Sequence, residues 1–217
     1  MPSVIRRMIS ALAAGLAVLA LAPGALAQQP YTEIVPPLAT GAKGKVEVVE
    51  FFWYECPHCY DLEPALAKWV AALPKDVEFV RVPATFNERW TVSARVYYAL
   101  EAMRLLPKLH AALFNAIHEG GLRITDERQR ADWLQRQGVD AAKFQATFAS
   151  PAVDAKIKRA GELVRAAKIE GVPALMIDGR YLVSAGDAIK SNAQMLEVTD
   201  ALIAQRRKAS APATKKN

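Results

Sequence analysis

The chain has 217 residues, of which 52% are hydrophobic and 23% are charged. This length fits one domain, or one domain with a large insertion, and the composition supplies a core and excludes a disordered chain. The formal net charge of +6 is too small to indicate a nucleic-acid-binding protein.

Residues 1–27 have the pattern of an export signal. Arg6 and Arg7 precede an apolar run over residues 8–22, and residues 25–27, Ala-Leu-Ala, form a small-x-small cleavage site. The apolar run is shorter than the roughly 20 residues that span a bilayer. We therefore expect cleavage and a periplasmic mature protein, with an uncleaved membrane anchor as the alternative.

The next predicted elements form a strand-helix-strand unit. Residues 28–44 are expected to be an extended lead-in, and the β-forming run 45–52 predicts a central strand. The sequence Cys56-Pro57-His58-Cys59 then opens a segment with apolar residues at helical spacing, and residues 77–82 predict a second strand. Pro57 suits a first helical turn, where its missing N–H costs nothing. This order implies a right-handed parallel unit.

The pattern from about residue 91 to residue 169 is wholly helical. Pro and Gly residues divide it, and we expect helices near 92–105, 107–119, 126–137, 141–149 and 152–168. Thr125 and Asp140 are the expected N-caps of the third and fourth of these helices.

The chain then returns to β structure. Residues 174–177 and 180–183 are apolar runs joined by Asp178-Gly179, a pair typical of a two-residue hairpin turn. Ser191 and Gln194 form a capping-box pattern that opens a last helix. The order of elements predicts an α/β sheet interrupted by a helical insertion.

The C-terminal segment is basic. The last helix is expected to end near Arg207, and the clusters 206–208 and 215–216 lie past the last apolar position. A solvated, frayed C-terminus explains these charges better than a binding patch does. We expect residues 209–217 to form a flexible basic tail.

Cys56 and Cys59 are the two cysteines of the chain. A bridge that closes so short a loop removes little entropy from the unfolded chain, so the pair indicates redox chemistry instead of a structural staple. The free N–H groups and the positive end of a helix stabilise a thiolate on Cys56, and His58 adds a hydrogen bond or a positive charge. A stabilised thiolate makes the disulfide an oxidant. Cys59 should be more buried and act as the resolving thiol.

Half of a zinc site is the alternative for a Cys-x-x-Cys sequence. Structural zinc takes four ligands, and the further imidazoles of this chain are His58, His110 and His118. His110 and His118 are eight residues apart, outside the usual spacing of zinc ligands. We therefore expect no metal and no cofactor, and we interpret these two as ordinary surface or partly buried histidines.

The residues around the cysteine pair resemble a known family. The segment from Glu50 to Tyr60 is similar to the active-site segment of the DsbA family, the periplasmic disulfide oxidases, and Gly171-Val172-Pro173-Ala174 resembles its second signature. The order of elements matches as well, over about residues 46–207. The resemblance implies a thioredoxin-like fold with an inserted helical domain. Its parts would be 28–90 (thioredoxin-like, N-terminal part), 91–169 (inserted helical domain) and 170–208 (thioredoxin-like, C-terminal part).

The resemblance also implies roles and partners. Cys56 would be the nucleophile and Cys59 the resolving thiol, and Pro57 and His58 would tune the redox potential. Reduced or unfolded exported proteins would be the substrates, and a quinone-linked membrane oxidase of the DsbB type would reoxidise the protein. We expect a monomer.

The second signature would carry a cis-proline. Pro173 would be cis, would present the backbone of Val172 to an extended substrate, and would crowd the sulfurs enough to discourage metal binding. Sequence alone indicates only a turn or the start of a strand here, since cis is the minority state of an X-Pro bond.

Glu50 is the candidate proton carrier. Its parity along the strand matches Val46, Val48 and Phe52, so a central strand would bury it. Burial raises the pKa of a carboxyl group, and the family carries an acid here that exchanges a proton with the residue matching Cys59. A glutamate that reaches solvent or a lysine is the alternative.

Glu55 departs from the family pattern, which often has an aromatic or apolar residue before the first cysteine. A carboxylate at this position opposes formation of the Cys56 thiolate. We expect its exposure to screen most of that effect. A set of apolar residues could line a substrate groove or belong to the core: Trp53, Phe86, Trp90, Leu175 and Met176. Of these, Leu175 and Met176 are favoured for the groove because they follow Pro173.

Two other functions stay open. A periplasmic reductase or isomerase of the thioredoxin type would use the same pair at a lower potential. Isomerases of this kind carry an extra N-terminal dimerisation domain, for which the short lead-in leaves no room. A binding or chaperone-like module would protect substrates from aggregation without its cysteines.

Overall fold

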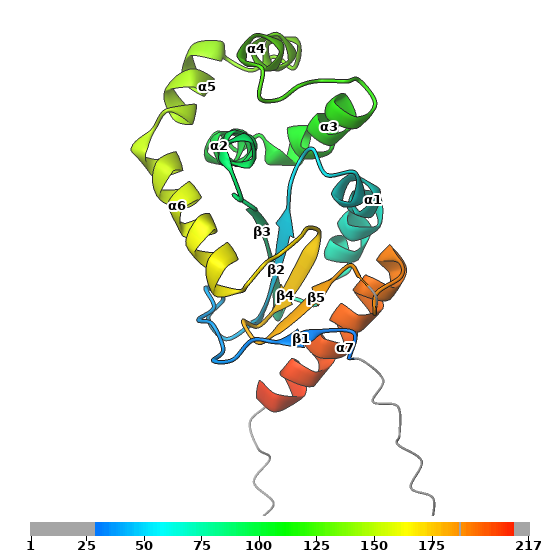
Figure 1. Cartoon of the computed structure of the whole chain (residues 1–217). Coiled ribbons are helices and arrows are strands. Elements are labelled where there is room, and N and C mark those ends of the chain that lie inside the picture. The colour runs from blue at the N-terminus through cyan, green and yellow to red at the C-terminus, as the bar shows by residue number, and fades with distance from the viewer. Residues whose placement is uncertain (1–28, 187, 211–217) are drawn as a thin grey trace, which may run out of the picture.

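A computed structural model of the protein describes residues 29–186 and 188–210 (Figure 1). The predicted export signal and most of the predicted basic tail lie outside the described residues. Within the described part of the chain, no helix combines the length and the apolar character that crossing a membrane requires.

The strands form one mixed sheet in the order β1-β5-β4-β2-β3. They are β1 (Thr32–Glu33), β2 (Val46–Phe52), β3 (Val77–Pro83), β4 (Ala174–Ile177) and β5 (Tyr181–Ser184). All seven residues of β2 are buried, and β2 pairs in parallel with β3 and antiparallel with β4. Helix α1 (Pro57–Ala71) joins β2 to β3, so the predicted parallel strand-helix-strand unit is confirmed.

The two faces of the sheet contact separate hydrophobic cores. On one face, Val48 and Leu175 pack with residues of α1 and of α7 (Asn192–Ser210). On the other, Val49 and Met176 are cross-strand partners and pack with the helices between β3 and β4. Successive residues of a strand point to opposite faces, so a sheet covered on both sides needs apolar residues at almost every position. This explains the nearly continuous apolar run of β2.

Five helices lie between β3 and β4 in the chain. They are α2 (Glu88–Ala102), α3 (Leu106–His118), α4 (Glu127–Arg136), α5 (Ala141–Phe148) and α6 (Pro151–Ala166). Helix α2 packs on α5 and α6, and α3 packs on α1 and α2. In Figure 1, α2 and α3 lie beyond the end of β2 that leads into α1, and α6 returns alongside the sheet. The predicted α/β sheet interrupted by helices is confirmed.

The hairpin and most helix ends follow local sequence. Asp178 and Gly179 have φ angles of 52° and 63°, the left-handed conformations of the expected turn between β4 and β5. Gly179 is required there, because a Cβ atom would lie 2.2 Å from the backbone oxygen of Leu38. The Asp140 side chain accepts a hydrogen bond from the Lys143 amide at 2.8 Å, which confirms that N-cap.

One local expectation is incomplete and another is wrong. The lead-in contains β1, which pairs with the edge of β5; a two-residue strand is too short to show alternation in the sequence. The N-cap of α4 is Asp126 and not Thr125. Asp126 has extended backbone angles, and its carboxylate accepts a hydrogen bond from the Gln129 amide at 3.0 Å.

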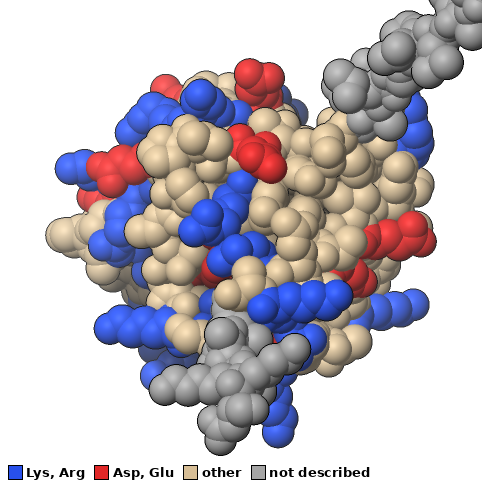
Figure 2. Space-filling view, turned by 90° about the horizontal axis from the view of Figure 1, so that it is seen from below, with Lys and Arg blue, Asp and Glu red and all other residues tan. Residues whose placement is uncertain are grey.

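The basic cluster at the end of α7 is not frayed. The helix continues through Ser210, and the guanidinium groups of Arg206 and Arg207 each donate to an aspartate at 2.6 Å, to Asp178 and Asp76 respectively. These ion pairs attach the end of α7 to the β4–β5 turn and to the segment before β3. Seen from below, Lys and Arg side chains are spread over the surface among acidic and uncharged ones (Figure 2).

Candidate active site

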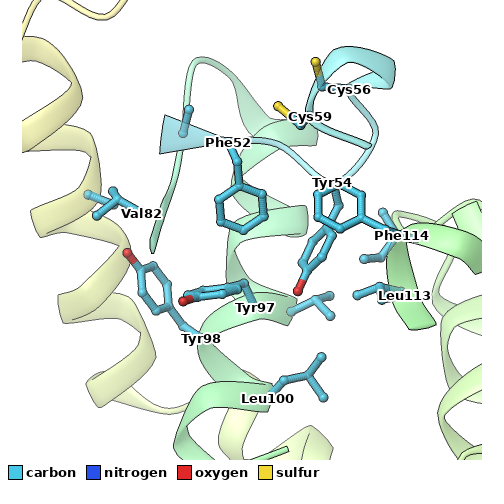
Figure 3. Close-up of a cluster of buried hydrophobic side chains, with 14 of the residues drawn as sticks. Phe52, Tyr54, Cys56, Cys59, Val82, Tyr97, Tyr98, Leu100, Leu113 and Phe114 are labelled. Atoms are coloured by element: carbon cyan, nitrogen blue, oxygen red, sulfur yellow. The ribbon is translucent and has the colours of Figure 1, made fainter. Parts of the chain in front are cut away.

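The redox pair lies where β2 ends and α1 begins. Cys56 is the N-cap of α1 in an extended conformation, and Pro57 is its first helical residue. The Cys56 amide donates to the Trp53 backbone oxygen at 3.0 Å, and the Tyr60 amide donates to the Cys56 oxygen at 3.1 Å. The chain therefore turns from strand to helix at the first cysteine. Figure 3 shows both sulfur atoms at the edge of the aromatic cluster beneath them.

The two thiols have opposite electrostatic environments. A hydrogen bond from Cys59 is the main cause that lowers the pKa of Cys56 from 9.0 to about 6. Burial opposes this effect, whereas the backbone amides of Cys59 and His58 and the charge of His58 add to it. Burial raises the pKa of Cys59 well above its ordinary value, and its contacts with Cys56 add to the rise. The pair therefore consists of one anionic sulfur and one protonated sulfur.

The two cysteines differ less in solvent exposure than in pKa. Cys56 is 7% exposed and Cys59 is fully buried, so Cys56 is the one of the two that solvent reaches. Both are free thiols in this structure. His58 is exposed and lies at the rim of a cavity of about 1070 Å³.

The loop before β4 faces the redox pair. The Val172–Pro173 peptide bond is cis, as the family resemblance implies, and the Cys56 sulfur lies 3.5 Å from the Val172 backbone oxygen. Val172 and Pro173 also line the cavity that His58 borders, together with apolar residues of the lead-in and of β5 such as Ile34 and Leu182. The cavity therefore reaches the loop whose Val172 backbone oxygen lies 3.5 Å from the Cys56 sulfur.

Glu50 lies in the sheet behind the pair. Its residue is 1% exposed, and burial is the main cause that raises its carboxyl pKa from 4.5 to about 7. The Arg81 guanidinium, 2.9 Å away, opposes that rise. Glu50 therefore contacts neither solvent nor a lysine but a partly buried arginine. Its charge is also one of the causes that raise the pKa of Cys59.

Arg81 joins Glu50 to a second buried acid that the sequence did not single out. The guanidinium donates to Glu63 of α1 at 3.0 Å, and Nε2 of His110 lies 3.5 Å from the same carboxylate. Burial raises the pKa of Glu63, but His110 and Arg81 outweigh it and the net pKa is lowered. Glu63 therefore carries the negative charge of this cluster, and Glu50 holds a proton more readily.

Two histidines of α3 hold the loop before the cysteines. His110 is buried and its Nδ1 lies 2.8 Å from the Tyr54 hydroxyl, and Nε2 of His118 lies 2.8 Å from the Tyr54 backbone oxygen. The ring of His118 also stacks on Tyr60, with centroids 4.6 Å apart. Their spacing of eight residues places both on one face of α3, a signal that sequence analysis used only to exclude zinc.

No group of three or more His, Cys, Asp or Glu residues in the described ranges is arranged to hold a metal ion. His110 and His118 face Tyr54 from α3, whereas His58 is exposed at the start of α1.

The expectation that Glu55 is exposed is wrong. Its side chain is 8% exposed, because the Arg89 guanidinium covers it with two hydrogen bonds of 2.8 and 3.1 Å. An ion pair, and not screening by water, offsets the charge of this carboxylate.

The candidate groove residues separate into two groups. Leu175 and Met176 are core residues of β4, 0% and 1% exposed, so favouring them for a groove is wrong. Phe86 is 41% exposed, and Trp90 stacks on Trp53 with ring centroids 4.1 Å apart. Trp53, in the loop before the cysteines, and Trp90 are partly buried against the core, whereas Phe86 is exposed.

Comparison with known proteins places this arrangement in a family. The model of the DSBA-like thioredoxin domain matches residues 47–197. The thiol:disulfide interchange protein DsbA of Pseudomonas syringae pv. tomato is 41% identical to this chain. The match covers 82% of this chain and 83% of the relative. The chain belongs to the DsbA family. The DsbA of Bordetella pertussis is 40% identical and covers still more, 93% of this chain and 97% of the relative.

Solved DsbA structures share the fold. The crystal structure of Pseudomonas aeruginosa DsbA matches with a TM-score of 0.79 at 37% sequence identity, over 83% of this chain and 94% of that chain. The DsbA-like thioredoxin fold is thus confirmed, and the protein is a disulfide oxidoreductase of the thiol:disulfide interchange type. The interval of residues 47–197 includes the Cys56–Cys59 pair and the cis-proline loop.

Proposed function

We propose that this DsbA-family protein oxidises reduced or unfolded exported proteins by giving them its Cys56–Cys59 disulfide. The observation that carries the proposal is the contrast between the two thiols. The pKa of Cys56 is lowered to about 6 and that of Cys59 is raised. A sulfur that is stable as an anion is a good leaving group, so the disulfide is easily given away.

The reaction begins on the oxidised protein. A substrate thiolate attacks the sulfur of Cys56; the bond between the two protein sulfurs breaks, and a mixed disulfide forms between the substrate and Cys56. The electron pair of the broken bond leaves on Cys59, which takes up a proton because its pKa is high. A second substrate thiolate then attacks the substrate sulfur of the mixed disulfide and releases Cys56 as a thiolate. Two electrons pass from the substrate dithiol to the protein.

Glu50 is proposed to exchange the proton that Cys59 gains or loses. A carboxyl group with a pKa of about 7 is present in both protonation states near neutral pH, so it can give and accept a proton there. Its charge and the titration of Cys59 influence each other. Arg81 of the neighbouring strand donates to this carboxylate, and Glu63 of α1 holds the Arg81 guanidinium in place.

The substrate is proposed to lie extended beside the cis-proline loop. The Val172 backbone would pair with the substrate chain, while Pro173 keeps this loop close to Cys56. Pro57 and His58 would tune the potential, Pro57 by starting α1 at the cysteine and His58 by its charge. The periplasm is the proposed location, and a quinone-linked membrane oxidase of the DsbB type is the proposed reoxidant.

Trapping of the mixed disulfide tests the proposal. Cys59→Ser should accumulate disulfide-linked substrate, because no Cys59 thiol is present to attack Cys56 and release the substrate, and Cys56→Ser should lose thiol-oxidase activity. Full oxidase activity in Cys56→Ser contradicts the assignment. A glutathione equilibrium distinguishes the alternative: a potential close to that of thioredoxin would indicate a reductase or isomerase.

A further inference from the structure

The residue next to the reactive cysteine is an acid that a single arginine neutralises. Glu55 directly precedes Cys56, and both of its carboxylate oxygens accept hydrogen bonds from Arg89, at 2.8 and 3.1 Å. The Glu55 side chain is 8% exposed, whereas that of Arg89 is 62% exposed. A two-pronged contact of this kind fixes both groups in orientation as well as in distance.

Arg89 is held in place by more than its ion pair. It lies in the first turn of α2, where the Asn87 side chain caps the helix by accepting from the Trp90 amide at 3.2 Å. Its guanidinium lies over the ring of Trp53, 5.3 Å from the centroid, and Trp53 stacks on Trp90 at an interplanar angle of 10°. Two residues of α2 thus hold two residues of the loop before the cysteines (residues 53–55): Arg89 pairs with Glu55 by charge, and Trp90 stacks on Trp53.

Because Glu55 directly precedes Cys56, its contact with Arg89 affects the charge on the cysteine sulfur. An unpaired carboxylate one residue from Cys56 would disfavour a second negative charge on the cysteine sulfur. The low exposure of Glu55 leaves little water to screen it, so its counter-ion decides how strongly that repulsion acts. The guanidinium of Arg89 is the group that touches it.

We propose that Arg89 is a positioning residue of the redox site: by neutralising and orienting Glu55 it keeps the Cys56 sulfur anionic and the disulfide oxidising. This inference rests on the oxidase function proposed above. It means that a helix between β3 and β4 helps to set the redox potential of the cysteine pair, through a contact between Arg89 and Glu55, which are 34 positions apart in the chain.

A double-mutant cycle on the full mature chain tests the inference. Arg89→Met keeps the length of the side chain but cannot pair, so the thiolate absorbance of Cys56 should titrate about half a pKa unit higher. The equilibrium with glutathione should shift about threefold toward a more stable disulfide. Arg89→Met combined with Glu55→Gln should return both readouts to those of Glu55→Gln alone, because no carboxylate then needs neutralising.

The matched control is Arg95→Met, on the same helix. Arg95 pairs with Asp154 and lies over Phe148, away from the cysteine loop, so its loss should change neither readout. Equal shifts in Arg89→Met and in the double variant would show a structural role only and overturn the inference. An unchanged Arg89→Met would also overturn it. If Arg89→Met does not fold, Arg89→Lys, which keeps the charge without the fork, should give an intermediate shift, and no shift overturns the inference.

The same titration separates this inference from the proposed function. A wild-type Cys56 that ionises like free cysteine contradicts the oxidase itself. A wild-type Cys56 with a low pKa that is insensitive to Arg89 contradicts only the role of Arg89.

Discussion

The hydroxyl oxygen of Tyr54 lies 2.8 Å from Nδ1 of His110, which joins the loop before the cysteines to α3. Burial is the main cause that lowers the pKa of His110, so the ring is neutral near pH 7. Nε2 faces the Glu63 carboxylate at 3.5 Å, which can only accept, so Nε2 carries the ring proton and Nδ1 accepts from the Tyr54 hydroxyl. Tyr54 is fully buried among Phe52, Phe114 and Tyr97, as Figure 3 shows. The inserted helices thus fix the backbone from which Cys56 is presented.

Tyr54→Phe should destabilise the protein by about 1–3 kcal/mol, because it leaves the buried Nδ1 of His110 without a donor. Denaturant unfolding of the oxidised and reduced proteins measures the change. Tyr98→Phe is the matched control: its ring belongs to the same core, but its hydroxyl makes no hydrogen bond within residues 29–186 and 188–210. An equal loss in both variants would contradict the importance of the contact with His110.

The reduced protein should lose stability as the pH falls through the pKa of Cys56. Because that pKa is lowered from 9.0 to about 6, the stabilisation is fully present above about pH 9 and disappears as the pH drops below about 6. Between about pH 8 and about pH 6, reduced wild type should lose about 2 kcal/mol relative to Cys56→Ser. Urea midpoints of the two proteins across this range measure it, and parallel curves would contradict the low pKa.

Glu50 should have the opposite dependence on pH. Its pKa is raised from 4.5 to about 7, so its contribution to stability is fully present below about pH 4.5 and is lost as the pH rises through 7. The stability of Glu50→Gln minus that of wild type should therefore increase by about 3 kcal/mol between about pH 4.5 and about pH 8. Arg81 retains Glu63 as a partner in this variant.

Glu78→Gln is the control for Glu50→Gln. Glu78 lies on the neighbouring strand in an exposed pair with Lys45, so its replacement should leave the slope of stability against pH nearly unchanged. If Glu50 carries protons for Cys59, Glu50→Gln should also slow formation of the mixed disulfide, the step in which Cys59 leaves and takes up a proton, while the pKa of Cys56 changes little. An unchanged rate of mixed-disulfide formation at every pH would exclude the relay.

Local sequence patterns were sufficient for the order of elements and for the position of the redox pair, whereas the thioredoxin-like fold was expected from the family resemblance. A β-forming run followed by Pro57 determines where the strand ends and the helix begins, and Asp178-Gly179 determines the hairpin. These features depend on neighbours a few residues apart. The short strand β1 was missed because pairing with β5, and not its own pattern, makes it a strand.

The sequence did not predict which side chains the site residues contact. Tyr54 and His110 are 56 positions apart, and Arg89 and Glu55 are 34 apart. Which side chains meet depends on how α2 and α3 dock against the cysteine loop, and no local pattern encodes that. The burial of Glu55 was misjudged for the same reason, since the arginine that covers it comes from another element.

The end of α7 offers a comparison between two adjacent arginines. Arg206 pairs with Asp178 where both side chains are mostly buried, 18% and 16% exposed, whereas Arg207 pairs with Asp76 where the exposed fractions are 44% and 50%. An exposed pair is screened by water and contributes little, and a shielded pair leaves a poorly solvated charge when one partner is removed.

Arg206→Met should therefore lower the free energy of unfolding by about 1–2 kcal/mol, and Arg207→Met by less than about 0.5 kcal/mol. Both variants replace one arginine of the same helical turn with the same residue, so helix propensity and net charge cancel in the comparison. Denaturant unfolding at two salt concentrations measures the difference. The effect of Arg207→Met should vanish at high salt while that of Arg206→Met persists, because salt screens exposed charges most. Equal losses that both vanish at high salt would mean that the end of α7 is frayed after all.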